Sequence, residues 1–185
     1  MLEVRFHGRG GQGAVTSAEL AAQAAIEEGR FAQAFPSFGP ERRGAPVIAY
    51  LRISDTQIRD RTAIQEPNVV IVLDPSLPGI VPVGQGLKPG GSLVLNSSHT
   101  PAKLHEEFGL TGRIAAVDAN HIAREEIGRV ITNTTMLGAF VKATGIVSTD
   151  ALAAAIQRRF GHIAGRNIKA FQRAHEETVI EEVGS

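Results

Sequence analysis

Cysteine is absent from the 185 residues of this chain. Without a thiolate the chain can form no disulfide, no thiolate zinc site and no iron–sulfur cluster of its own. An excess of charge is also lacking, because nineteen Lys and Arg residues balance nineteen Asp and Glu residues. We therefore expect neither nucleic acid nor an anionic membrane as the main partner.

Segments that direct a protein to or through a membrane are missing too. No apolar run approaches the roughly 20 residues that span a bilayer, and the N-terminus lacks a basic-then-apolar signal pattern. We expect a cytoplasmic protein with no membrane contact. The six histidines show no metal-ligand spacing, and neither a Walker P-loop nor a G-x-S-x-G elbow occurs. The sequence thus predicts no metal site and no complete catalytic apparatus.

The most informative stretch is LEVRFHGRGGQG at the start of the chain. It predicts a strand over Leu2 to His7, a glycine turn, and a helix over Ala14 to Glu28, which is how a doubly wound α/β fold begins. Such a turn leaves the first N–H groups of the helix uncovered, and these attract anions. The candidate contact residues in this turn are Gly8, Gly10, Gly11, Gln12 and Gly13.

Alternating and β-branched runs continue along the first two-thirds of the chain, and helical patterns fill the last third. They predict one α/β domain over residues 1–185, a three-layer α/β/α fold with a Rossmann-like, mostly parallel sheet. Further strands are predicted at 31–35, 47–53, 69–73, 93–96 and 113–117. Helices are predicted at 120–128, at 132–144, from 148 or 149, and from about 167 to 178 or 179.

The glycines Gly8, Gly10 and Gly13 match G-x-G-x-x-G, which raises a dinucleotide hypothesis. A nicotinamide site needs an acid at the end of the second strand, and residues 31–35 contain none. The stretch LKPGGSLVL suggests a methyltransferase, but no acid precedes the first glycine turn as those enzymes require. Contact with an anion or ligand and simple turn geometry remain alternatives for these glycines.

Two further groups of polar residues are candidates. Arg42 and Arg43 lie in a loop rich in glycine and proline, where guanidinium groups suit phosphate, carboxylate or a subunit interface. A solvated loop with an ion pair is the alternative. Asp74, Asn96 and Asp118 each end a predicted strand, where ligands gather in open sheets. For these three, and for 133–135 at a helix start, turn formation and helix capping are the favoured interpretation.

Four blocks occur in order along nearly the whole chain: RFHGRGGQGAVTSAELAA, AQAFPSFGPERRGAPVIAYLRI, EPNVVIVLDPSL and NTTMLGAFVKATG. Together they resemble the gamma subunit of pyruvate:ferredoxin oxidoreductase and related 2-oxoacid:acceptor oxidoreductases. The ERRGAP form resembles the pyruvate and branched-chain versions more than the 2-oxoglutarate versions.

This resemblance implies an enzyme built from separate chains, in which this chain is a structural and positioning subunit, inactive alone. Alpha and beta subunits, with a ferredoxin-like delta subunit in some complexes, would carry thiamine diphosphate, Mg²⁺ and [4Fe-4S] clusters. Coenzyme A would accept the acyl group and ferredoxin the electrons. No catalytic residue is assigned to this chain, and we expect a homodimer or larger when it is isolated. A free-standing Rossmann-type nucleotide enzyme and a plain interaction module are the alternatives.

Overall fold

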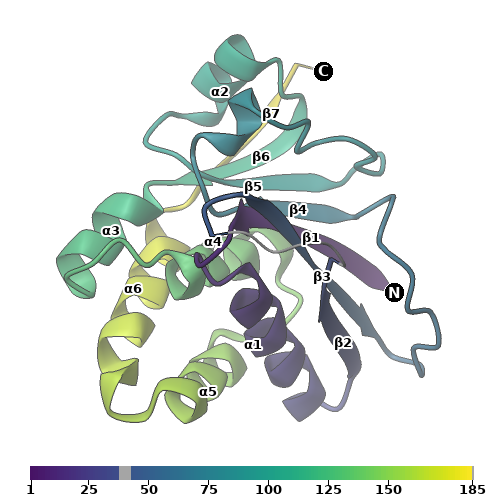
Figure 1. Cartoon of the computed structure of the whole chain (residues 1–185), viewed down its shortest axis with the longest axis vertical. Helices are drawn as coiled ribbons and strands as arrows, with labels where there is room; N and C mark the ends of the chain where they lie inside the picture. Colours follow the sequence, from purple (N-terminus) through teal and green to yellow (C-terminus); the bar gives the residue numbers. More distant parts are fainter. Residues whose placement is uncertain (38–42, 185) are drawn as a thin grey trace.

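The computed structural model describes residues 1–37 and 43–184, which form a seven-stranded sheet with helices (Figure 1). The strand order is β2-β3-β1-β4-β5-β6-β7. The strands are β1 (Leu2–Arg9), β2 (Phe31–Pro36), β3 (Pro46–Ser54), β4 (Val69–Val72), β5 (Ser92–Asn96), β6 (Gly112–Val117) and β7 (Val179–Val183). The α-helices are α1 (Ala14–Glu27), α2 (Pro101–Phe108), α3 (Ala119–Glu126), α4 (Asn133–Thr144), α5 (Thr149–Phe160) and α6 (Ala164–Glu177), and two 3-10 turns are η1 (Leu77–Gly79) and η2 (Gly161–Ile163).

Strands β1, β4, β5 and β6 run parallel, while β3 and β7 run against their neighbours. The predicted α/β class and mostly parallel sheet are therefore confirmed. The central β4 is buried on both faces, as its unbroken β-branched sequence requires. Among the helices of residues 1–37 and 43–184, none is long and apolar enough to cross a bilayer.

The two faces of the sheet are covered unequally. Figure 1 shows α1, α3, α5 and α6 gathered to one side of the sheet, with α4 between them and the strands. On this face Phe6 of β1 packs on Phe140 of α4, with ring centroids 6.2 Å apart. The other face has a smaller core in which Leu104 of α2 and Leu77 of η1 cover Val72 and Leu95. The expected third layer is thus thin, made of one short helix, a 3-10 turn and loops.

Two elements differ from the sequence prediction. The last helix stops at Glu177, and β7 then pairs antiparallel with β6. Val179 matched the helical spacing, but an apolar residue at that place suits a strand as well. Helix α2 was not predicted, although Thr100 caps it by accepting a hydrogen bond from the Lys103 N–H at 3.4 Å and Pro101 occupies its first turn.

Parallel strands bring their carboxyl ends to one edge of the sheet. The glycine loop after β1, the Asp74 turn after β4 and Asn96 at the end of β5 therefore meet there. Helix α4 begins at the same edge, because Thr132 just before it lies 3.5 Å from the Leu73 carbonyl. This edge holds most of the polar residues that the sequence singled out.

Candidate functional site

The glycine loop after β1 needs glycine at two positions for its backbone conformation. Gly11 and Gly13 have φ values of 93° and 80°, the left-handed region that side chains disfavour. Gly13 is also the N-cap of α1, and no side chain of the described residues caps that helix. A Cβ at Gly13 would lie 2.7 Å from Nδ2 of Asn133, so α1 and α4 begin side by side. Turn geometry is thus confirmed as one reason for these glycines, and ligand contact stays a prediction.

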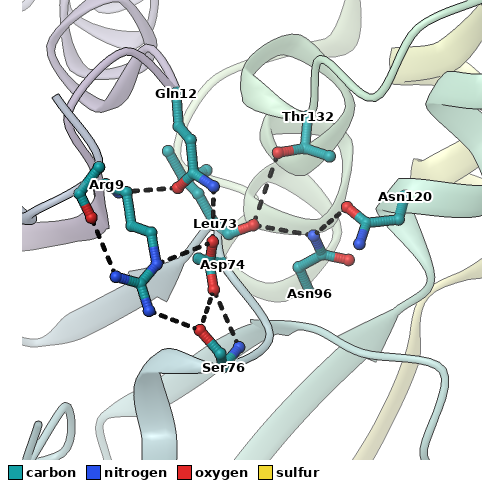
Figure 2. A network of polar contacts seen from close by, with 9 residues as sticks. Arg9, Gln12, Leu73, Asp74, Ser76, Asn96, Asn120 and Thr132 are labelled. Carbon is teal, nitrogen blue, oxygen red and sulfur yellow. Dashed lines mark hydrogen bonds and ion pairs between the residues drawn. The ribbon is translucent and has the colours of Figure 1, made fainter. Parts of the chain in front are cut away.

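Asp74 is the centre of a polar network that holds this loop (Figure 2). Gln12 donates from Nε2 to Oδ2 of Asp74 at 2.6 Å and accepts from the Arg9 N–H at 2.7 Å. The Arg9 guanidinium lies 3.4 Å from the same carboxylate oxygen and donates to Ser76 Oγ at 2.9 Å. Ser76 in turn donates to Oδ1 of Asp74 through its hydroxyl and its backbone N–H. Each polar atom of this network restrains its neighbours.

The same network fastens the arginine-containing loop to the glycine loop. Arg9 donates to the Gly44 carbonyl at 2.9 Å, and backbone hydrogen bonds join Gly10 to Gly44 and Ala45. Gly10 and Arg43 form an isolated parallel bridge. The structure therefore brings the exposed Arg43 beside the glycine loop, an arrangement that the sequence analysis does not predict. Arg42 lies outside the described residues.

A second set of contacts continues the network toward α3 and α4. Asn96 donates from Nδ2 to the Leu73 carbonyl at 2.8 Å and to Asn120 Oδ1 at 2.9 Å, and accepts from the Ala119 N–H at 3.0 Å. Asp118 caps α3 by accepting from the His121 N–H at 2.9 Å, as capping predicted. Asn96 thus ties three strand ends together, and Asp118 takes no part in the network.

The start of α4 lacks the side-chain capping hydrogen bond at its N-cap residue that the sequence predicts, as far as the described residues show. Thr132 occupies the N-cap position and makes no capping hydrogen bond through its side chain. Asn133 instead accepts from the adjacent Thr134 N–H at 2.9 Å, and Thr134 donates to Asn167 Oδ1 at 2.8 Å. The side chains at this helix start therefore link α4 to α6 and leave the N-cap uncovered by a side chain.

Charge at this edge is arranged around Asp74 and His7. Burial raises the pKa of the Asp74 carboxyl, but the hydrogen bonds from Ser76 and Gln12 and the charge of Arg9 outweigh it and lower that pKa. Burial, with a smaller effect of the Arg5 cation, lowers the pKa of His7 to about 4. At neutral pH Asp74 is therefore an anion and His7 is neutral.

The described residues at this edge suit neither a metal nor a dinucleotide. In the part of the chain that the structure describes, no group of three His, Asp or Glu side chains could hold a metal ion. The antiparallel β3 lies between β1 and β2, so the end of β2 is separated from the glycine loop. The described residues at the end of β2 therefore place no acid beside the glycine loop, where the ribose of a dinucleotide needs one.

The sequence predicts a turn or a helix cap at Asp74, with ligand contact as the alternative, and it indicates no role for Arg9. The turn is confirmed, because the Ser76 N–H donates to Asp74 at 3.0 Å. The hydrogen bond between Asp74 and Gln12 joins residues 62 positions apart, and no local sequence pattern predicts such a pair. A short Asp-x-Ser turn at the end of a buried strand is the only local signal that could have pointed to it.

Comparison with known proteins gives consistent matches. The family described as "Pyruvate ferredoxin/flavodoxin oxidoreductase" matches residues 3–177. The chain is 51% identical to "Pyruvate/ketoisovalerate oxidoreductases common subunit gamma" of Thermococcus litoralis, covering 99% of this chain and 100% of that protein. It is 49% identical to "Pyruvate synthase subunit PorC" of Methanothermobacter thermautotrophicus, with 96% of each covered. The crystal structure of pyruvate oxidoreductase subunit PORC from Thermotoga maritima superposes with a TM-score of 0.86, at 38% identity and 98% coverage of both chains.

Proposed function

Since this chain belongs to the pyruvate ferredoxin/flavodoxin oxidoreductase family, we propose that it is the gamma subunit of a 2-oxoacid:ferredoxin oxidoreductase with pyruvate as its substrate. The complex would convert pyruvate and coenzyme A to acetyl-CoA and CO₂, passing electrons to ferredoxin, or run in reverse. The observation that carries this proposal is the end-to-end match with relatives that are themselves named as subunits. A branched-chain 2-oxoacid is the second candidate substrate, because the first of these relatives is a common subunit for pyruvate and ketoisovalerate.

The residues of this chain do not fit the redox groups of such a complex. A [4Fe-4S] cluster needs thiolate ligands, and the sequence contains no cysteine. The proposal therefore assigns thiamine diphosphate, Mg²⁺ and the clusters to alpha, beta and delta partner chains. When bound there, these groups supply the decarboxylation and electron-transfer chemistry. This chain contributes shape and binding groups at its interface with them.

The edge around the glycine loop fits an anionic group such as a coenzyme A phosphate. Among the described residues no side chain caps the first turn of α1, so its N–H groups and the helix dipole can attract an anion. Arg43 adds an exposed guanidinium beside Gly10. Asp74 neutralises Arg9 and holds Gln12, which keeps the loop in shape. We accordingly propose Gly8 to Gly13 and Arg42–Arg43 as contacts for ligand or partner.

The function is tested by purifying the tagged chain from its native cells. We expect two or three partner chains to co-purify, and the complex to reduce ferredoxin with pyruvate and coenzyme A while the chain alone shows no turnover. Oxidation of ketoisovalerate but not pyruvate would reassign the substrate. Elution of the chain without any partner would contradict the proposal.

The same complex tests the proposed contact site. Arg43→Ala should raise the KM for coenzyme A about tenfold with little change in kcat, because it removes one charge-assisted contact of about 1.5 kcal/mol. Arg30→Ala is the matched control, since that arginine pairs with Asp55 at the far end of β2. An unchanged KM for Arg43→Ala would remove this residue from the site.

A further inference from the structure

Most of the exposed large apolar side chains are isolated from one another in the sequence, and one pair is not. Among the described residues, only Val130 and Ile131 are exposed large apolar neighbours in the sequence, with 52% and 42% of their surface accessible. They lie in the connection between α3 and α4, immediately before Thr132. Single exposed apolar residues are ordinary, but two together at a fixed place mark a candidate contact surface.

A third exposed apolar residue is linked to the start of α4 through two hydrogen bonds. Ile163 in η2 is 51% exposed, and its carbonyl accepts from Asn167 Nδ2 at 3.1 Å. Asn167 accepts from the Thr134 hydroxyl at 2.8 Å, in the first turn of α4. Ile163 is therefore tied to the helix end that Val130 and Ile131 precede. We call Val130, Ile131 and Ile163 the apolar rim.

The apolar rim adjoins the candidate site and is held in place from two sides. Thr132, next to Ile131, lies 3.5 Å from the Leu73 carbonyl of the polar network, and Asn133 touches Gly13 of the glycine loop. On the other side, Arg173 of α6 binds Glu125 and Glu126 at the end of α3. A surface fixed before binding loses little conformational entropy when a partner covers it.

The charges beside the rim suggest what covers it. Arg129 precedes Val130 and Arg166 follows Ile163 by one turn, and both are exposed. Within the described residues neither forms an ion pair. A second copy would bring its own cations to the same rim, whereas an apolar patch edged by carboxylates on another protein would complement it.

Resting on the proposed function, we propose that the apolar rim is where this chain packs against the cofactor-carrying subunit of its complex, through an apolar patch edged by carboxylates. This contact would set the glycine loop and Arg43 facing the partner, because the rim and the loop share the edge of the sheet at Gly13 and Asn133. Burial of apolar side chains would supply the affinity, and Arg129 and Arg166 would guide the approach.

The test introduces Ile131→Asp and Ile163→Asp into the tagged chain and measures the partner chains that co-purify from native cells. Both side chains are exposed, so thermal unfolding of the free variants should match the unmodified chain. We expect each variant to retain at least tenfold less partner. Ile26→Asp is the matched control, because Ile26 is 53% exposed at the other end of α1, about 20 Å along the helix from Gly13. It should retain the full amount.

The outcomes separate this surface from the proposed function. If the unmodified chain binds its partners and the rim variants bind them equally well, the surface is wrong and the function stands. If the unmodified chain binds no partner, both are overturned. If Ile131→Asp turns a dimeric free chain into a monomer and leaves partner binding intact, the rim holds a second copy, and the proposal is overturned.

Discussion

Two basic residues on β1, Arg5 and His7, are buried, and their polar groups differ in hydrogen bonding. Arg5 keeps its charge, and its guanidinium donates to the carbonyls of Val83 and Gln85 in the segment that covers the sheet. His7 lies two residues further along the same face, and its buried Nε2 has no hydrogen-bond partner among the described residues. Arg5 thus anchors the covering segment, whereas His7 is accommodated only while it is neutral.

We predict that His7 makes the protein less stable as the pH falls from 6.5 toward 4. Its folded-state pKa of about 4 lies below its ordinary value of 6.5, so the unfolded chain binds the proton first over this range. One such proton lowers the free energy of unfolding by up to about 1.4 kcal/mol per pH unit. Urea unfolding at pH 7.5, 6.0 and 5.0 measures this slope.

His7→Leu should flatten that slope, since an apolar side chain at this position does not titrate. His162→Gln, at an exposed position in η2, serves as the control and should keep the slope of the unmodified chain. The carboxyls of Glu3 and Asp74, whose pKa values are lowered, lose their contribution only at more acidic pH and do not mask the effect. If the free energy of unfolding of His7→Leu fell with pH as steeply as that of the unmodified chain, His7 would not be the cause of the slope.

At the scale of elements, α4 and α6 approach closely because α4 has a glycine, Gly138, where the two helices meet. A Cβ on Gly138 would lie 2.1 Å from the Phe171 carbonyl oxygen and 2.8 Å from the His175 nitrogen. Both neighbours are backbone atoms, so they cannot move without shifting α6. The small residue is therefore needed for packing, although glycine disfavours a helix interior.

We predict that Gly138→Ala destabilises the protein by about 1–3 kcal/mol, the usual cost of overpacking a core. Gly165→Ala in α6 is the matched control, because nothing lies within 4 Å of its Cβ position and the change should stabilise by about 0.4–1 kcal/mol. Chemical unfolding of both variants measures the two effects. A Gly138→Ala variant as stable as the unmodified chain would show that the helices can separate freely.

At the scale of the whole molecule, a continuous sheet joins the two unequal cores. Tyr50 is the single tyrosine and no tryptophan is present, which makes it a convenient reporter. Its side chain is buried on β3 against Phe35, with ring centroids 5.1 Å apart. This reporter follows the β2–β3 end of the sheet, while far-UV circular dichroism follows all the helices.

We predict that residues 1–185 unfold as one domain in a single cooperative transition. Tyrosine fluorescence and circular dichroism should then give the same midpoint and the same slope in urea. Both cores share the strands of the same sheet, so neither face can be lost alone. Two separate midpoints would divide the chain into independently unfolding parts.

The sequence by itself determined the elements whose signals are local. The alternation in β1, the buried β-branched run of β4 and the alanine-rich α1 each follow from neighbouring residues, and their predicted bounds lie within about two residues of the structure. The four sequence blocks likewise indicated the family. Such signals can be recognised in the sequence alone because they depend on residues a few positions apart.

Only the tertiary structure decided which distant residues meet. It placed β3 between β1 and β2, added β7 at the far edge, and brought Asp74 to Gln12 across 62 positions. It also linked Ile163 to the first turn of α4 through Asn167. These arrangements arise because strand order, helix packing and long-range hydrogen bonds depend on the whole folded chain, and no short segment encodes them.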